Sequence, residues 1–261
     1  MLLRFKSLFI LILLAAAPVV AQDQSSILRD TNGDGVVSYL GFGDSITFGV
    51  GDTEYPTGGG YVLRLGQLLG IQAINKGVPG EELLAAGVYR FPEVVAATSA
   101  DVVSVMEGTN DAVKRADSLL MRHAYQRTIN IARARGKEIL LMTLPSPTAE
   151  HAATGPFTDS YSYISADVAK VNDIRLVDFR RAWLTTCVDR VECELYNLPE
   201  GLHPNGQGYV VMAQTLAAAI LGIDIFAADG AGNLEAALGL EPGTVIVKPE
   251  VSTPVAPPAA N

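Results

Sequence analysis

The sequence predicts an α/β fold in which a parallel sheet is covered by helices on both of its faces. Short strand-like segments alternate along the chain with segments of helical periodicity. The strand segments are short and apolar, which is typical of parallel strands that helices cover on both sides. With 261 residues, of which 49% are hydrophobic and 18% charged, the chain suits one sizeable domain.

The first half of the chain supplies two expected strands and two expected helices. Residues 36–40 are an apolar run that ends at a glycine-punctuated turn, and residues 61–69 carry apolar side chains at helical spacing. Residues 71–75 are expected to be the second strand, and the Gly- and Pro-containing residues 75–80 form a turn. Residues 81–89 are expected to be helical because acidic residues occupy the first turn, where the helix dipole favours them.

The second half continues this alternation. Residues 101–106 and 138–144 are apolar and are expected to be strands, and prolines end the second of them. A long helix is expected between them, capped by Asp117 or Ser118 and stopped by Gly136.

The last elements complete the expected domain. Residues 148–158 are small and polar and suggest a loop, residues 161–171 a helix, and residues 174–179 the fifth strand. The apolar helix expected at 206–221 follows Asn205, a common N-cap residue.

The N-terminus has the pattern of a cleaved signal peptide. Arg4 and Lys6 precede an apolar run, Leu8 to Val20, and small residues before residue 22 offer a cleavage site. The apolar run is shorter than the ~20 residues that a membrane-spanning helix needs. We therefore expect residues 1–21 to be removed and the mature protein to be secreted or periplasmic, with no stable membrane span.

Three segments are expected in the mature chain. Residues 22–35 form an N-terminal segment, and the α/β domain spans residues 36–222. Residues 223–261 form an extension that becomes rich in proline and alanine and is expected to be disordered or loosely attached.

The net charge of −9 argues against a nucleic-acid partner, which would require a basic face. We expect a monomer.

The segment Asp30-Thr31-Asn32-Gly33-Asp34-Gly35 matches the opening of an EF-hand calcium loop. Oxygen-bearing side chains occupy the first, third and fifth positions, and the turn glycine occupies the sixth. The twelfth position, where a glutamate is usual, is Gly41. Two interpretations stay open: a weak structural calcium site made by Asp30, Asn32 and Asp34, and an Asx-rich turn that needs no ion.

Cys187 and Cys193 are the two cysteines of the chain. An exported protein meets an oxidising compartment, where a pair of cysteines usually bonds. We expect a disulfide that holds the segment before the C-terminal histidine motif, and the alternative is two free buried thiols. A metal site is not expected, because two sulfurs without a nearby histidine pair do not make the usual four-ligand set.

A candidate nucleophile lies in Gly41-Phe42-Gly43-Asp44-Ser45-Ile46-Thr47, directly after the first expected strand. Serine needs a base and an oxyanion site before it can attack a carbonyl. Gly77 and Asn110 each follow another expected strand. Because ligands bind outside the carboxyl ends of parallel strands, we expect Ser45, Gly77 and Asn110 to converge there.

His203 is the candidate base. It lies in Glu200-Gly201-Leu202-His203-Pro204-Asn205, just before the last helix. Glu200 can reach the imidazole across the tight turn and fix its tautomer, so that His203 accepts the proton of Ser45. His123 is expected on a helix surface and His151 in an exposed loop.

Four short blocks together resemble the SGNH hydrolases, also called GDSL esterases and lipases. In the order of that family they are Gly43-Asp44-Ser45, Gly77 within Asn75-Lys76-Gly77, Gly108-Thr109-Asn110-Asp111, and Glu200-x-x-His203. The resemblance implies a three-layer α/β/α sandwich with a flavodoxin-like parallel sheet of five strands. It also implies chemistry that requires no metal ion or other cofactor.

By this resemblance Ser45 is the nucleophile, His203 the general base and Glu200 the acid that orients it. The backbone N–H groups of Ser45 and Gly77 and the side-chain amide of Asn110 would form the oxyanion hole. The resembling blocks also contain Asp44 and Asp111, which we expect to support the site.

The chain departs from the family pattern at Glu200, where an aspartate is usual. Glutamate is one methylene longer, so the geometry of the third triad member stays open. Asp178, at the end of the fifth expected strand, is the alternative orienting acid.

The expected function is that of an exported serine ester hydrolase. The substrate would be a small-molecule, glycan or lipid ester, and the Gly-rich loop after Ser45 together with few aromatic residues favours short acyl chains or acetylated sugars. A lysophospholipase- or thioesterase-like lipid acyl hydrolase and an acyltransferase are alternatives with the same triad. A non-catalytic surface binding module is the alternative of another class.

Overall fold

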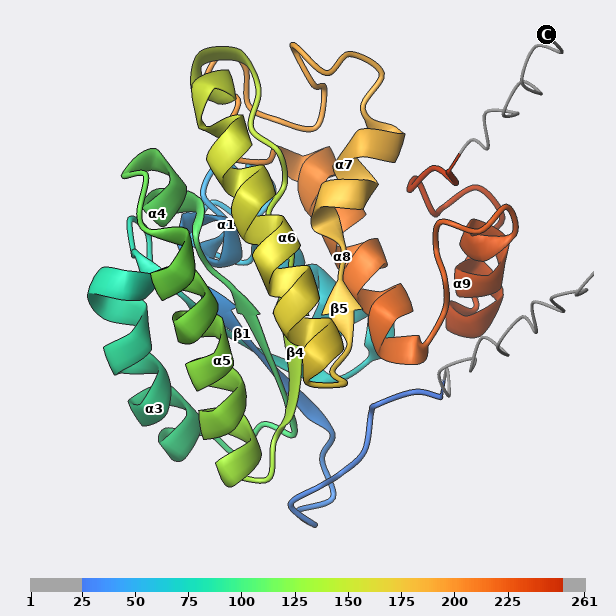
Figure 1. Ribbon diagram of the computed structural model, residues 1–261. Coiled ribbons are helices and arrows are strands. Elements are labelled where there is room, and N and C mark those ends of the chain that lie inside the picture. Colours follow the sequence, from blue (N-terminus) through green and yellow to red (C-terminus); the bar gives the residue numbers. More distant parts are fainter. Residues whose placement is uncertain (1–24, 251–261) are drawn as a thin grey trace, which may run out of the picture.

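The computed structural model describes residues 25–250, which form a parallel sheet with helices on both faces (Figure 1). The sheet has five strands in the order β2-β1-β3-β4-β5, which is the flavodoxin-like doubly wound order. The strands are β1 Ser38–Gly43, β2 Gln72–Gly77, β3 Val102–Met106, β4 Glu138–Met142 and β5 Leu176–Val177. The expected three-layer α/β/α fold is confirmed.

Helices α3, α5 and α6 lie side by side on one face of the sheet, and α2 and α8 pack against each other on the other face (Figure 1). The helices are α1 Ser45–Phe48, α2 Gly60–Leu69, α3 Val88–Ala97, α4 Thr109–Val113, α5 Ser118–Ala134, α6 Gly155–Val171, α7 Phe179–Thr186, α8 Gly206–Leu221 and α9 Gly230–Leu238. Two shorter turns are the π-helical η1 Leu83–Gly87 and the 3₁₀-helical η2 Ala149–Thr154.

The register of the central strands brings three chain segments to one edge of the sheet. Gly43 at the end of β1 pairs with Gly77 at the end of β2 and with Met106 at the end of β3. The segments that follow these strands therefore begin at the same level. The first residues of α1 and α4 are consequently close in space.

Strand β1 is shifted toward the C-terminus relative to the expected 36–40. Val36 is 48% exposed, whereas all six residues from Ser38 to Gly43 are buried. The glycines that suggest a turn belong to the strand. Glycine is needed there because neighbouring side chains fill the space that a Cβ atom would take. A Cβ on Gly41 would lie 2.6 Å from Cγ2 of Val62, and one on Gly43 would lie 2.0 Å from Oγ1 of Thr47.

Other boundaries also differ from expectation. The fifth strand is shorter than 174–179 because Asp178 caps α7, with its Oδ1 accepting a hydrogen bond of 3.0 Å from the backbone of Arg181. The expected loop at 148–158 contains η2 and the first residues of α6. The helix expected at 81–89 is instead η1 followed by α3.

The first part of the C-terminal extension is not loosely attached, which corrects the expectation from composition. Leu234 of α9 is fully buried, and Val245 and Val247 are also buried. The side chain of Gln214 in α8 donates to the carbonyl of Thr244 over 2.9 Å and accepts from the backbone of Ile246 over 2.9 Å. These contacts dock residues 223–250 on the domain.

Two sequence expectations fall outside the described residues: the signal peptide at 1–21 and the last part of the extension, residues 251–261. Within residues 25–250, none of the helices has the length and apolar character needed to span a bilayer.

Candidate active site

Ser45 begins α1, directly after β1. Its neighbour Asp44 is the N-cap of this helix and accepts a hydrogen bond of 2.9 Å from the backbone of Ile46. Gly49, with φ of 103°, ends the helix after a single turn. As the first residue of a helix, Ser45 has a backbone N–H without an intrahelical acceptor. The side chain and this N–H both lie at the carboxyl edge of the sheet.

His203 contacts Ser45 directly. Its Nε2 lies 2.9 Å from Oγ of Ser45, and its Nδ1 is hydrogen-bonded to the carboxylate of Glu200. The second carboxylate oxygen of Glu200 accepts the backbone N–H of His203 over 3.0 Å. If Nδ1 carries the proton that Glu200 accepts, Nε2 is free to take the proton of Ser45. This is the arrangement of a nucleophile, a base and an orienting acid.

The longer carboxylate of Glu200 therefore reaches His203. Asp178, the alternative acid, has other partners: its Oδ1 accepts from Oγ1 of Thr143 over 2.9 Å and from the backbone of Arg181. The structure brings Glu200 rather than Asp178 to the imidazole.

The turn that carries Glu200 and His203 is held by the segment 148–151. Three consecutive carbonyl groups of the turn accept hydrogen bonds from it. The pairs are Pro199 with the backbone of Glu150 at 3.2 Å, Glu200 with Nδ1 of His151 at 2.7 Å, and Gly201 with the backbone of Thr148 at 2.8 Å. His151 is thus partly buried against the turn that carries Glu200 and His203, rather than simply exposed. No spacing in the sequence signals this contact.

Asn110 belongs to α4, at the end of β3. Its side-chain amide donates a hydrogen bond of 2.8 Å to the carbonyl of Glu81. An amide nitrogen has two N–H groups, so one remains for a substrate oxygen. Asn110 therefore suits the expected oxyanion role.

Gly77 does not suit the oxyanion role expected for it. Its backbone N–H already donates to Oδ1 of Asn75 over 2.8 Å. A Cβ at this position would lie 2.1 Å from the backbone nitrogen of Phe48. Gly77 is required because α1 packs closely against the end of β2.

Gly80 offers a backbone N–H donor that the sequence did not single out. Its φ is 80°, a Cβ there would meet nothing within 4 Å, and no acceptor within residues 25–250 is hydrogen-bonded to its backbone N–H. The next residue, Glu81, is the one whose carbonyl binds Asn110. The Gly77-x-x-Gly80 spacing is the signal that could have drawn attention to it.

Three acidic side chains, Asp44, Glu107 and Asp111, lie near one another at this edge of the sheet, and burial raises the pKa of each. The pKa of Asp44 rises to about 7. Burial first and the charge of Asp44 second raise the pKa of Glu107 well above its ordinary value. Neither carboxyl oxygen of Glu107 has a hydrogen-bond partner within residues 25–250. Asp111 accepts from the backbone of Leu83 over 2.7 Å and so holds the start of η1.

The loop with the calcium-like pattern uses its side chains to bond its own backbone. Oδ1 of Asp30 accepts from Gly33 over 2.7 Å, and Oδ1 of Asn32 accepts from Asp34 over 2.8 Å. Oδ1 of Asp34 accepts from Val36 over 2.9 Å. These are the contacts of an Asx-rich turn, and calcium binding stays a prediction.

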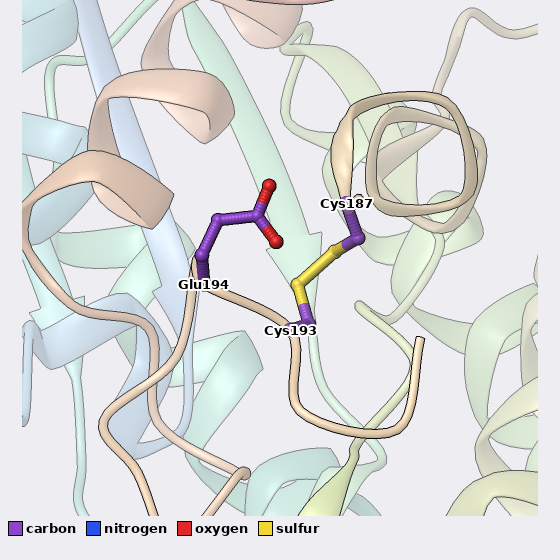
Figure 2. A group of neighbouring side chains, drawn as sticks. All are labelled: Cys187, Cys193 and Glu194. Atoms are coloured by element: carbon purple, nitrogen blue, oxygen red, sulfur yellow. A yellow bond between two sulfur atoms is a disulfide. The ribbon is translucent and has the colours of Figure 1, made fainter. Parts of the chain in front are cut away.

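The expected disulfide between Cys187 and Cys193 is present, with 5.4 Å between the Cα atoms. It joins the residue after α7 to the segment that leads into the triad turn. Figure 2 shows Glu194 beside the bond, and its carboxylate accepts the backbone N–H of Val188 over 3.0 Å. The two sulfurs are bonded to each other, so the pair closes the loop between Cys187 and Cys193 covalently.

Residues 42–211 match the model of the GDSL-like lipase/acylhydrolase family. The chain belongs to this family. The matched range contains Ser45, Asn110, Glu200 and His203. This GDSL-type protein is therefore an ester-bond hydrolase, and a non-catalytic binding module is set aside.

Several solved structures share this fold. A G-D-S-L family protein from Desulfitobacterium hafniense DCB-2 is 24% identical, with a TM-score of 0.59, and covers 70% of this chain and 99% of its own. An acetylxylan esterase from Geobacillus stearothermophilus is 22% identical, with a TM-score of 0.59, over 73% of this chain and 96% of its own. An α/β hydrolase from the metagenome of Lake Arreo, Spain, is 21% identical, with a TM-score of 0.60, over 70% and 94%. No curated protein sequence matches the chain.

Proposed function

We propose that this GDSL-type esterase uses Ser45, His203 and Glu200 as a catalytic triad and forms an acyl-enzyme. The observation that carries the proposal is the 2.9 Å contact between Oγ of Ser45 and Nε2 of His203, with Glu200 bonded to the other ring nitrogen. His203 would take the proton of Ser45 as its oxygen attacks the ester carbonyl, and would return it to the leaving alcohol. A water molecule would then release the acid by the reverse sequence.

The oxyanion hole of this proposal contains the backbone N–H of Ser45, the side-chain amide of Asn110 and the backbone N–H of Gly80. Gly80 replaces Gly77 because the N–H of Gly77 is already bonded to Asn75. Each donor is neutral and would lie where negative charge develops in the transition state. The developing charge would thus be stabilised without a metal ion.

The proposed substrates are esters of short acyl groups, with acetylated sugars as the leading class. An acetylxylan esterase that has the same fold and is 22% identical supports this choice. The Gly-rich loop at 58–60 and the 7% content of aromatic residues are consistent with a small acyl group. Hydrolysis of a longer lipid ester and transfer of the acyl group to an alcohol are the alternative outcomes.

Export of the enzyme is part of the proposal. The basic residues and apolar run before residue 22 support a signal peptide. The Cys187–Cys193 disulfide is consistent with an oxidising compartment. We propose a monomeric enzyme that is secreted or periplasmic.

The test is hydrolysis of p-nitrophenyl acetate, butyrate and octanoate by the mature protein and by the Ser45→Ala variant. Ser118→Ala, at an exposed position in α5, is the matched control. We expect turnover that is fastest on acetate, is lost in Ser45→Ala and is unchanged in Ser118→Ala. Equal rates for the native protein and Ser45→Ala would overturn the proposal.

A second assay examines the sugar ester directly. Acetylated xylo-oligosaccharides are incubated with the enzyme, with and without an added alcohol acceptor, and the products are separated by mass. Release of acetate identifies hydrolysis, and an acetylated acceptor identifies transfer. Faster turnover of octanoate than of acetate, without acetate release from the sugar, would replace the sugar ester by a lipid ester.

A further inference from the structure

We propose that Arg90 is a positioning residue for the oxyanion hole: it ties together the two ends of the turn 76–81 and thereby fixes the donors on Gly80 and Asn110. The inference rests on the proposed function. Arg90 lies in α3 and is part of none of the four blocks that carry the family resemblance.

The guanidinium of Arg90 bonds both ends of this turn. Its Nε donates to Oε1 of Glu81 over 2.6 Å, and its Nη2 lies 2.6 Å from Oε2 of the same carboxylate. Its Nη1 donates to the carbonyl of Lys76 over 3.0 Å. One rigid group therefore sets the separation between residues 76 and 81.

The turn is also tied to the strand that carries the nucleophile. The backbone N–H of Val78 donates to the carbonyl of Gly43 over 2.9 Å, and the N–H of Glu81 donates to the carbonyl of Val78 over 3.1 Å. Arg90 stacks on the ring of Phe42, with 4.0 Å between its central carbon and the ring centroid. Residues of β1 thus support the guanidinium and the turn together.

Glu81 transmits this constraint to both donors. Its carbonyl accepts the side-chain amide of Asn110 over 2.8 Å, and its backbone follows Gly80 directly. A displacement of Glu81 would therefore shift the remaining N–H of Asn110 and the N–H of Gly80 at the same time. Donors aimed at a developing charge lose their effect when they are misplaced by about 1 Å.

The chemistry of this contact favours arginine over other cations. The side chain of Glu81 is 2% exposed, so its charge needs a partner that replaces water. The planar fork of arginine bonds a carboxylate through two nitrogens and still offers the third to Lys76. A lysine ammonium could pair with Glu81 but could not hold the fixed geometry to both ends of the turn.

The experiment compares Arg90→Met and Arg90→Lys with the native mature enzyme. Arg133→Met is the matched control, because Arg133 also lies on a helix and donates to a carbonyl, that of Asn172, over 2.6 Å. It lies in the last turn of α5, which leads into the start of β4 and so is at the opposite edge of the sheet from the carboxyl ends of the strands. Three quantities are measured for each variant: kcat, KM for p-nitrophenyl acetate, and the inhibition constant of a trifluoromethyl ketone. The serine oxygen adds to the carbonyl of the ketone, and the negative oxygen of the adduct would occupy the oxyanion hole.

We expect Arg90→Met to lower kcat about 10- to 100-fold, since removal of one oxyanion donor typically costs about 10²–10³. KM should change by less than about threefold, because the ground-state ester uses these donors less than the transition state does. The inhibition constant of the ketone should rise in parallel with the loss of kcat/KM. Arg90→Lys should retain an intermediate activity, and Arg133→Met should match the native enzyme.

Several outcomes would overturn the inference. They are native kcat in folded Arg90→Met, a loss confined to KM, an unchanged ketone inhibition constant despite reduced kcat, or an equal loss in Arg133→Met. If Arg90→Met does not fold, the Arg90→Lys variant decides by the same criteria. Turnover that survives in Ser45→Ala would instead disprove the proposed function, whatever the result for Arg90.

Discussion

Nε2 of His203 lies 2.9 Å from Oγ of Ser45, although the two residues are 158 positions apart in the chain. Ser45 is placed by β1 and the start of α1, and His203 by a turn that segment 148–151 holds through three consecutive carbonyl groups. Distant parts of the chain thus create a contact that a serine protease-like mechanism requires.

Glu200→Gln should lower kcat by about 10²–10⁴, because an amide cannot stabilise the imidazolium and favours the wrong tautomer of His203. The matched control is Asp178→Asn, at the alternative acid. Asp178 caps α7 and contacts Thr143, so its replacement should affect stability more than kcat. Steady-state kinetics on p-nitrophenyl acetate, with melting temperatures for both variants, measure the difference. A larger loss of kcat in Asp178→Asn would assign the orienting role to Asp178.

Asn110→Ala should lower kcat by about 10²–10³ with a small change in KM, as expected for loss of one oxyanion donor. Gly77→Ala should instead lower the melting temperature, since the added Cβ would lie 2.1 Å from the backbone of Phe48. Kinetics and thermal unfolding of the two variants separate a donor from a packing position. Native kcat in a folded Asn110→Ala enzyme would remove Asn110 from the oxyanion hole.

His151→Ala should lower kcat several-fold, because the bond of 2.7 Å from its Nδ1 to the carbonyl of Glu200 is lost. His151→Asn should recover much of the activity, since the amide nitrogen of asparagine can replace Nδ1 as a donor. His123→Asn, at an exposed position in α5, is the control and should be neutral. Equal kcat values in His151→Ala and the native enzyme would show that the remaining backbone bonds hold the turn alone.

Asp44 and Glu107 are buried acids whose contribution to stability falls as pH rises. Burial raises the pKa of Asp44 from 3.8 to about 7 and raises that of Glu107 well above 4.5. Between the unfolded and folded pKa values the folded state binds more protons, so the free energy of unfolding decreases with pH from about 4 to about 7 and above. Glu107→Gln should reduce this dependence and raise the melting temperature at pH 8 relative to the native protein.

The control for this prediction is Glu138→Gln, at an exposed carboxylate at the start of β4. It should leave the pH dependence of the melting temperature unchanged. The gain in Glu107→Gln should disappear at pH 4, where the native carboxyl is also neutral. An equal difference in melting temperature between Glu107→Gln and the native protein at pH 4 and at pH 8 would contradict the raised pKa of Glu107.

Much of the fold was predictable from the sequence because its strands are apolar and its helices periodic. The alternation of these segments identified all five strands of the sheet. Their boundaries were less predictable, since the glycines of β1 suggest a turn when read locally. Only the packing of Val62 and Thr47 against them shows why a strand needs glycine there.

The functional side chains of the site were predictable because their residue types indicate their chemistry. Ser45, Asn110, Glu200 and His203 carry functional side chains in a recognisable order, and the structure brings Glu200 to His203 and His203 to Ser45. Backbone donors carry no such signature, so the sequence alone points to Gly77 and does not single out Gly80. The choice depends on which N–H is already bonded, and that follows from the side chain of Asn75 in three dimensions.

The roles of His151 and Arg90 were not predictable for a related reason. Each acts on the backbone of a residue far away in the sequence, at Glu200 and at Lys76. The docking of residues 223–250 likewise depends on contacts of Gln214 and Leu234 that composition does not encode.

The most direct test of the central claim is identification of the residue that a fluorophosphonate labels. The mature enzyme is incubated with the reagent, digested and sequenced by mass spectrometry, beside the His203→Ala variant. We predict one adduct per chain, on Ser45, with parallel loss of esterase activity and far slower labelling in His203→Ala. Full esterase activity in a protein with labelled Ser45, or inactivation through an adduct on another residue, would contradict the account.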